Sequence, residues 1–142
     1  MSYLFVANSQ KATAVHYSAK AAFTSPNATN LILAKCNTLE LYSFSDQGLN
    51  LIKTVPIFGR VIGLEAYRPP GATKDLLFVL VERKKFCILE YDEAKEAIVT
   101  YAAGNLKERK GRSAELGQKC FPDPDLRVMG LQLYDSFIKV SD

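Results

Sequence analysis

The feature that most constrains the fold is a short hairpin pattern that occurs three times along the chain. Each copy consists of two strand-like apolar runs joined by a polar turn, and the copies begin at Leu31, Leu76 and about Arg127. Their spacing is therefore 45 and then about 51 residues. A repeat of roughly 40–50 residues with about four strands in each unit is the period of β-propeller blades. A single blade cannot bury both of its faces, so blades are stable only when they pack against neighbours.

The individual strands are predicted from apolar runs that turn residues interrupt. The run Asp75–Val81 is almost continuously apolar, which is typical of a strand buried on both faces. The segment 102–125 has few apolar residues and is predicted to be a long loop between strands. The predicted strands are Leu31–Ala34, Leu39–Phe44, Leu49–Ile57, Arg60–Tyr67, Asp75–Val81, Phe86–Tyr91, Ala97–Tyr101, Arg127–Tyr134 and Phe137–Val140.

The expected fold class is all-β, a partial β-propeller of about three blades of four antiparallel strands that does not close. Propellers hold roughly four to eight blades, and 142 residues at this period supply only about three. An unclosed stack exposes apolar blade faces. We therefore interpret the chain as the start of a longer protein, and we expect further blades or domains of that parent chain as its first partners.

Composition narrows the class of protein further. Hydrophobic residues make up 48% of the chain and charged residues 23%, which is ordinary globular usage. No apolar run approaches the roughly 20 residues of a membrane helix, and the N-terminus lacks a basic signal region, so we expect no membrane association and a nuclear or cytoplasmic protein. Cys36, Cys87 and Cys120 are expected to be buried free thiols. A net charge of +3 is too mild to predict a nucleic-acid binder by itself.

No constellation for catalysis emerges, so we predict no enzyme, no cofactor and no metal site. A Gly-x-Ser-x-Gly elbow and a complete phosphate loop are both absent from the sequence. The single histidine, His16, lies in a strand-like run and is interpreted as an ordinary strand residue, although a hydrolase that uses it remains a third hypothesis. Asp123 and Asp125 alternate with prolines, which favours a stiff turn over cation binding.

A basic cluster inside the predicted loop supplies the candidate partner-binding residues, which are Lys107, Arg109, Lys110 and Arg112. Arginine pairs in a bidentate manner with carboxylate or phosphate groups, so the loop is predicted to face an anionic partner. The alternative is a solvated loop whose charge only keeps the chain soluble. No aromatic residues alternate with these bases, which argues against binding of single strands by stacking. The strand aromatics are instead expected to pack between blades: Tyr42, Phe44, Phe78, Phe86, Tyr91 and Tyr134.

Short stretches that run in order along nearly the whole chain match a known family. They include Lys11–Val15, Asn30–Lys35, Lys74–Phe78, Cys87–Tyr91, Arg109–Arg112 and Gly130–Asp135. On these residues the chain resembles the N-terminal part of the first β-propeller in the family of DNA damage-binding protein 1, the adaptor subunits of cullin-4 ubiquitin ligases. One departure is the stretch after Gly117, where the family's apolar strand is replaced by 118–122 and the strand before Asp123 is weakened.

The resemblance implies a non-enzymatic protein-interaction scaffold in protein ubiquitination and the DNA damage response. Its implied partners are substrate-receptor proteins of cullin-4 ligases, with DNA contacted only indirectly, and its implied location is the nucleus and also the cytoplasm. The same superfamily includes the large cleavage-and-polyadenylation subunit and a splicing-factor 3b subunit. They imply an alternative, a nucleic-acid-associated module in which the loop from Lys107 to Arg112 would make the contacts.

Overall fold

The computed structural model describes residues 13–106, 118–125, 128–134 and 137–141 of the chain. The secondary structure of these ranges is almost entirely β. Its elements are β1 (Tyr17–Ala21), β2 (Asn30–Lys35), β3 (Thr38–Ser45), β4 (Gly48–Pro56), β5 (Val61–Tyr67), β6 (Leu76–Val81), the 3-10 helix η1 (Glu82–Lys84), β7 (Lys85–Asp92), β8 (Ala97–Asn105), β9 (Lys119–Pro122), β10 (Met129–Tyr134) and β11 (Phe137–Ser141).

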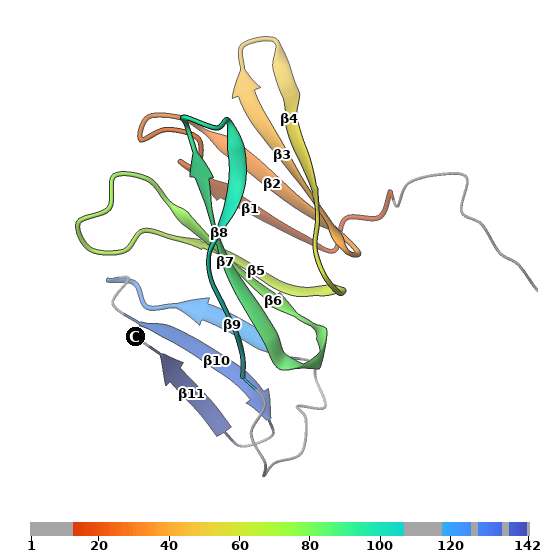
Figure 1. Cartoon of the computed structure of the whole chain (residues 1–142), viewed down its shortest axis with the longest axis vertical. Helices are drawn as coiled ribbons and strands as arrows, with labels where there is room; N and C mark the ends of the chain where they lie inside the picture. Colours follow the sequence, from red (N-terminus) through yellow and green to blue (C-terminus); the bar gives the residue numbers. More distant parts are fainter. Residues whose placement is uncertain (1–12, 107–117, 126–127, 135–136, 142) are drawn as a thin grey trace, which may run out of the picture.

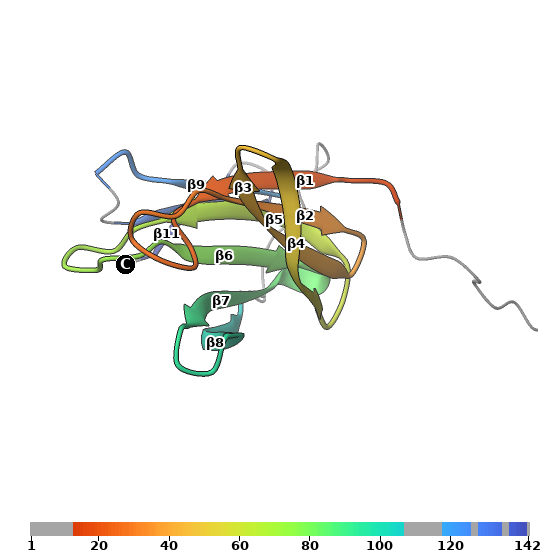
Figure 2. The same cartoon turned by 90° about the horizontal axis from the view of Figure 1, so that it is seen from above.

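The strands form separate antiparallel sheets in which neighbours in sequence are neighbours in space (Figure 1). The first sheet has the order β1-β2-β3-β4, the second β5-β6-β7-β8, and the third, within the described residues, β11-β10-β9. Strand β5 lies against β1 on one side and β9 on the other, so the first strands of the three sheets are adjacent (Figure 2). The sheets do not close into a ring, and the prediction of an all-β, unclosed propeller fragment is confirmed.

The two-sided burial of β6 connects the three sheets. All six of its residues are buried, and their side chains alternate between two cores. Leu77 and Val79 belong to the core shared with the first sheet, whereas Phe78 and Leu80 belong to the core shared with the third. The prediction from the continuous apolar run is therefore confirmed.

The first core fills the space between the first and second sheets. Its largest fully buried side chains include Phe23, Ile32, Leu39 and Leu41, which pack opposite the β5 and β6 residues. Fully burying an aliphatic or aromatic side chain of this size contributes about 1.5–3 kcal/mol relative to leaving it in water. This core is thus the main reason why the two sheets stay together.

The second core joins the second and third sheets. Phe78 stacks on Phe86 with ring centroids 5.5 Å apart, and Leu131 and Leu133 of β10 are almost fully buried beside them. The aromatic prediction is wrong for Phe44, whose side chain is 65% exposed near the end of β3, and for Tyr42, which belongs to neither core. Both lie on the face of the first sheet that has no neighbouring sheet in the described residues.

The three predicted hairpins correspond to β2–β3, β6–β7 and β10–β11, and so they form a pair of consecutive strands in each sheet. In the turn between β3 and β4, Gly48 has a φ of 110°, a conformation that other residues rarely adopt. The hairpins were predictable because both strands of each pair carry alternating or continuous apolar residues in the sequence.

The predicted loop 102–125 begins too early, and it contains a strand near its end. Strand β8 continues to Asn105, since Ala102–Asn105 pair with Lys85–Ile88 of β7, and β9 occupies Lys119–Pro122. Strand β9 occupies the stretch in which the family's strand was expected to be weakened; its short sequence shows no clear alternation, and pairing with β10 decides its conformation. Strand β1 was not predicted either, and His16 is an exposed residue that immediately precedes it rather than part of a strand.

Two of the cysteines also differ from the prediction of buried thiols. Cys36 lies in the β2–β3 turn with a φ of 57° and is only partly buried, as is Cys87 in β7. Cys120 is buried in the second core, and all three are free thiols.

Candidate functional site

The predicted partner-binding residues Lys107, Arg109, Lys110 and Arg112 lie outside the described residues. The structure does describe the residues that precede and follow their segment. The amide of Leu106 donates a hydrogen bond of 2.7 Å to the carbonyl oxygen of Lys84, and Leu106 is buried in the second core. On the return side, Gln118 leads directly into β9.

The β6–β7 turn and the β4–β5 connection form one continuous surface, which we call the turn face and define as residues 57–60 and 82–85. The amide of Glu82 donates to the carbonyl oxygen of Arg60 at 2.9 Å, which joins the two segments directly. A β-carbon on Gly59 would lie 2.6 Å from Cγ1 of Val81, so only glycine allows this close approach. The segments are therefore held together by backbone contacts.

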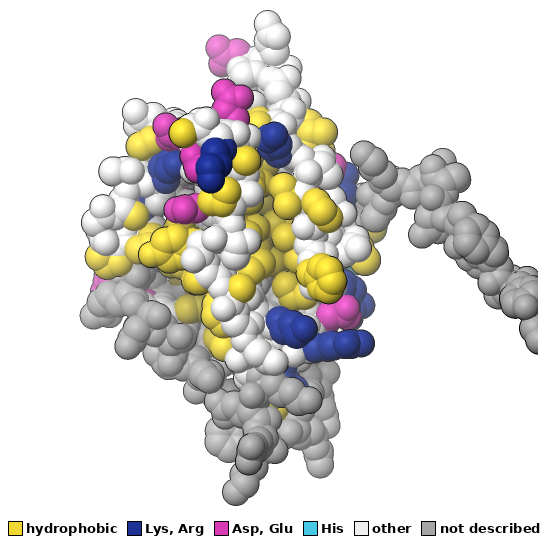
Figure 3. All heavy atoms as spheres, viewed as in Figure 1, with side chains coloured by type: hydrophobic (Ala, Val, Ile, Leu, Met, Phe, Trp, Pro, Cys, Tyr) yellow, Lys and Arg dark blue, Asp and Glu magenta, His cyan; other side chains and the backbone are white. Residues whose placement is uncertain are grey.

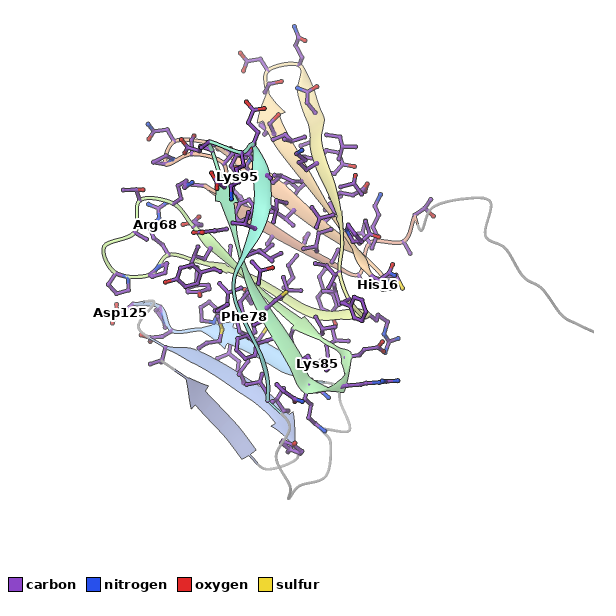
Figure 4. The ribbon with its side chains drawn as sticks, viewed as in Figure 1. His16, Arg68, Phe78, Lys85, Lys95 and Asp125 are labelled. Carbon is purple, nitrogen blue, oxygen red and sulfur yellow. The ribbon has the colours of Figure 1, made fainter. Side chains whose placement is uncertain are left out.

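The turn face combines exposed bases with one exposed aromatic ring. Arg60, Arg83 and Lys85 are exposed, and Glu82 is the acidic residue among them. Phe58 is 100% exposed in the β4–β5 connection. Figure 3 shows Lys and Arg side chains gathered at the end of the β6–β7 hairpin, and Figure 4 labels Lys85 at that hairpin.

A cavity of about 800 Å³ lies beside the turn face, between the first strands of the three sheets. Its lining includes His16, Arg60, Glu65, Gln118 and Cys120. Burial raises the pKa of the Glu65 carboxyl. Burial, followed by the negative charge of Glu65, raises the pKa of the Cys120 thiol to about 12, so this thiol stays protonated at neutral pH and is a poor nucleophile.

A second, more apolar groove of about 450 Å³ lies between the second and third sheets. Its lining includes Tyr67, Pro69, Phe86, Leu106 and Met129. Burial, and then the charge of Tyr101, raises the pKa of the Tyr67 hydroxyl. The groove continues the second core toward the surface.

The described residues also bear on the predictions about metal binding, the proline-flanked carboxylates and the membrane. Among them, no group of three or more His, Cys, Asp and Glu side chains could hold a metal ion. Asp123 begins a turn, as predicted, and its amide donates to the carbonyl oxygen of Val128 at 3.0 Å. In the part of the chain that the structure describes, no helix is long and apolar enough to cross a membrane.

Stacked antiparallel sheets with two shared cores define the class of protein, which is a set of β-propeller blades. The chain belongs to the RSE1/DDB1/CPSF1 first beta-propeller family, whose model matches residues 14–142.

Comparison with individual proteins supports the same family assignment. The chain is 43% identical over 136 residues to DNA damage-binding protein 1 of Solanum lycopersicum, a match that covers 96% of this chain and 12% of the relative. It is 42% identical over 139 residues to DNA damage-binding protein 1a of Arabidopsis thaliana, which covers 98% of this chain and 13% of the relative. The chain thus spans only about one eighth of the length of the curated relatives that it matches.

Proposed function

We propose that the chain supplies the opening blades of the first β-propeller in an adaptor scaffold, and that the parent scaffold recruits substrate receptors to a cullin-4 ubiquitin ligase in the DNA damage response. The observation that carries the proposal is the likeness to DNA damage-binding proteins over nearly the whole chain. A nuclear location, with a cytoplasmic pool, is part of the same proposal.

The first sheet supports the idea that further blades belong beside these. Leu31, Tyr42, Phe44, Leu49 and Leu51 share the face turned away from the second sheet, as the strand register shows. Phe44, Leu49 and Leu51 are 65%, 47% and 54% exposed, respectively. A contiguous apolar face of this kind is typical of a surface that another element covers. Remaining blades of a parent chain are the natural cover, since blades bury their faces against one another.

The test is a purification of the endogenous protein with an antibody against a segment within residues 13–106, followed by mass spectrometry of the intact protein and of the proteins that co-purify with it. We expect a species far heavier than 15.8 kDa that co-purifies with a cullin-4 subunit and with receptor proteins. A heavy species free of cullin and receptors would refute the adaptor role. A species of 15.8 kDa would refute assembly within a longer chain.

The alternative is a nucleic-acid-associated module, which the basic residues of the 107–112 segment and of the turn face favour. Binding that depends on phosphate contacts weakens steeply as salt is raised, because counterions are released on binding. The expected result for this alternative is salt-sensitive binding of an oligonucleotide that weakens in an Arg109→Ala, Arg112→Ala variant. Binding that is absent, or unaffected by salt, would exclude it.

A further inference from the structure

We propose that the turn face is a docking surface for an acidic segment of a partner protein that places one apolar residue against Phe58. The inference names a surface for the scaffold described above, and in that respect it rests on the proposed function. It is argued from the conformation of two loops, from the exposure of Phe58 and from the charges around it.

The loop that carries Phe58 is held in place on both sides of the ring. The amide of Ile57 donates to the carbonyl oxygen of Asn37 at 2.7 Å, and the amide of Val61 donates to that of Cys36 at 2.8 Å. Gly59 has a φ of 116° and fits tightly against Val81. The loop is therefore fixed by the first and second sheets, and it presents the ring to solvent without the entropic cost of ordering a mobile segment on binding.

The neighbouring turn is conformationally costly in a way that its sequence does not explain. Arg83 and Lys84 have φ values of 65° and 58°, in the left-handed region that glycine and asparagine adopt most readily. Two successive long basic residues in this conformation raise the conformational free energy of the turn relative to glycine or asparagine at the same positions. Such strain is concentrated at functional sites, where the surrounding structure enforces it.

The charges of the turn face have little internal compensation. Within the ranges that the structure describes, the ion pairs Lys35–Glu40, Arg68–Asp75, Lys74–Glu93 and Lys95–Asp92 do not involve Arg60, Arg83 or Lys85. Lys84 lies 4.3 Å from the centroid of the Tyr134 ring, so it is directed toward the third sheet and serves the fold. Three exposed bases therefore remain on the turn face, in the same two segments that carry Phe58, with Glu82 as the opposing charge.

This combination fits an acidic peptide better than a nucleic acid. Aromatic residues and arginine are the side chains that dominate protein–protein binding energy when a partner covers them. The affinity of a protein for nucleic acid comes largely from neutralising many phosphates with Lys and Arg, and three exposed bases supply few such contacts. A carboxylate-rich segment with a single apolar residue matches both the charge and the ring.

The probe is a fluorescein-labelled peptide of about twelve residues, rich in Asp and Glu, with one Phe, titrated with the full 142-residue chain and followed by anisotropy. We expect Phe58→Ala and the double variant Arg83→Glu, Lys85→Glu each to weaken binding about 10-fold or more, as for the central residues of an interface. Replacing the peptide Phe by Ser is expected to weaken binding to the wild-type chain but not to the Phe58→Ala variant. Circular dichroism checks that each variant keeps its β structure.

Matched controls come from the other regions of the molecule. Phe44→Ala removes another exposed aromatic ring, and Lys95→Glu reverses a base whose side chain is 73% exposed in the β7–β8 turn (Figure 4). Both are expected to bind the peptide within about 2-fold of the wild-type chain, as is usual for residues outside an interface. Equal losses in the control and test variants would overturn the proposal, as would no binding of the peptide to the wild-type chain.

An oligonucleotide of twelve thymidines is the competing probe. If it binds more tightly than the peptide and loses affinity in the same variants, the turn face is a nucleic-acid surface and the proposal fails. This assay is independent of the purification of cullin and receptors. If the peptide does not bind but cullin and receptors co-purify, the docking surface is refuted and the adaptor role stands. If the peptide binds but cullin and receptors do not co-purify, the adaptor role is refuted and the docking surface stands.

Discussion

Replacing Asn30 by alanine is expected to destabilise the chain more than its small size suggests. Asn30 is 1% exposed and is the buried polar residue of the described core. Its Oδ1 accepts hydrogen bonds from the amides of Phe23 at 3.1 Å and Thr24 at 3.0 Å and from the Thr24 hydroxyl at 3.1 Å. Its Nδ2 donates to the carbonyl oxygen of Tyr42 at 3.3 Å. One side chain thus fixes the β1–β2 connection against the first sheet.

The magnitude follows from the groups that would be left without partners. The amide of Phe23 is buried, and a buried group that loses its partner costs about 1–3 kcal/mol. Thr24 is only partly buried, so water compensates part of its loss. We therefore expect Asn30→Ala to lower the free energy of unfolding by about 3 kcal/mol, which corresponds to roughly 10 °C in the melting temperature.

The assay is urea unfolding of the full chain, followed by circular dichroism and by tyrosine fluorescence, since the chain contains no tryptophan. Asn37→Ala is the matched control, because Asn37 is exposed in the β2–β3 turn. Its free energy of unfolding is expected to stay within about 0.5 kcal/mol of the wild-type value. If Asn30→Ala and Asn37→Ala have the same stability, the reasoning from buried hydrogen bonds is wrong.

Three further predictions concern the contact between the second and third sheets and the thiols. Gly63→Ala is expected to lower the free energy of unfolding in urea by about 1–3 kcal/mol, because its β-carbon would lie 2.8 Å from Sγ of Cys120. The combined Gly63→Ala, Cys120→Ala variant should lose less stability than the sum of the two single variants, and strictly additive losses would contradict the contact. Burial raises the pKa values of Cys87 and Cys120, so alkylation at pH 8, read by mass spectrometry, should modify Cys36 first; equal rates before and after urea unfolding would contradict this order. Because burial raises the pKa of Glu65, the folded state binds its proton more tightly than the unfolded state, and the free energy of unfolding should fall as pH rises through and above about 4.5. Glu65→Gln should reduce this fall, and a pH profile of stability that is the same in the variant and the wild type would refute the prediction.

The sequence by itself determined the parts of the fold that repeat. The β2–β3, β6–β7 and β10–β11 hairpins were predictable because their apolar residues recur with the period of strands and with the spacing of blades. The same pattern predicted the two-sided burial of β6, since a strand that is apolar at every position is typically buried on both faces. These features are local, and therefore a single chain reveals them.

The tertiary structure alone decided the features that depend on contacts between distant segments. Strands β1 and β9 have weak patterns of their own, and their conformation comes from pairing with β2 and β10. The turn face exists because the β4–β5 connection packs on the β6–β7 turn across Gly59, and no spacing in the sequence predicts that residues 57–60 contact residues 82–85. The physical reason is that backbone hydrogen bonds and side-chain packing between sheets are set by the stacking of blades, whereas periodicity reports only the burial of each strand.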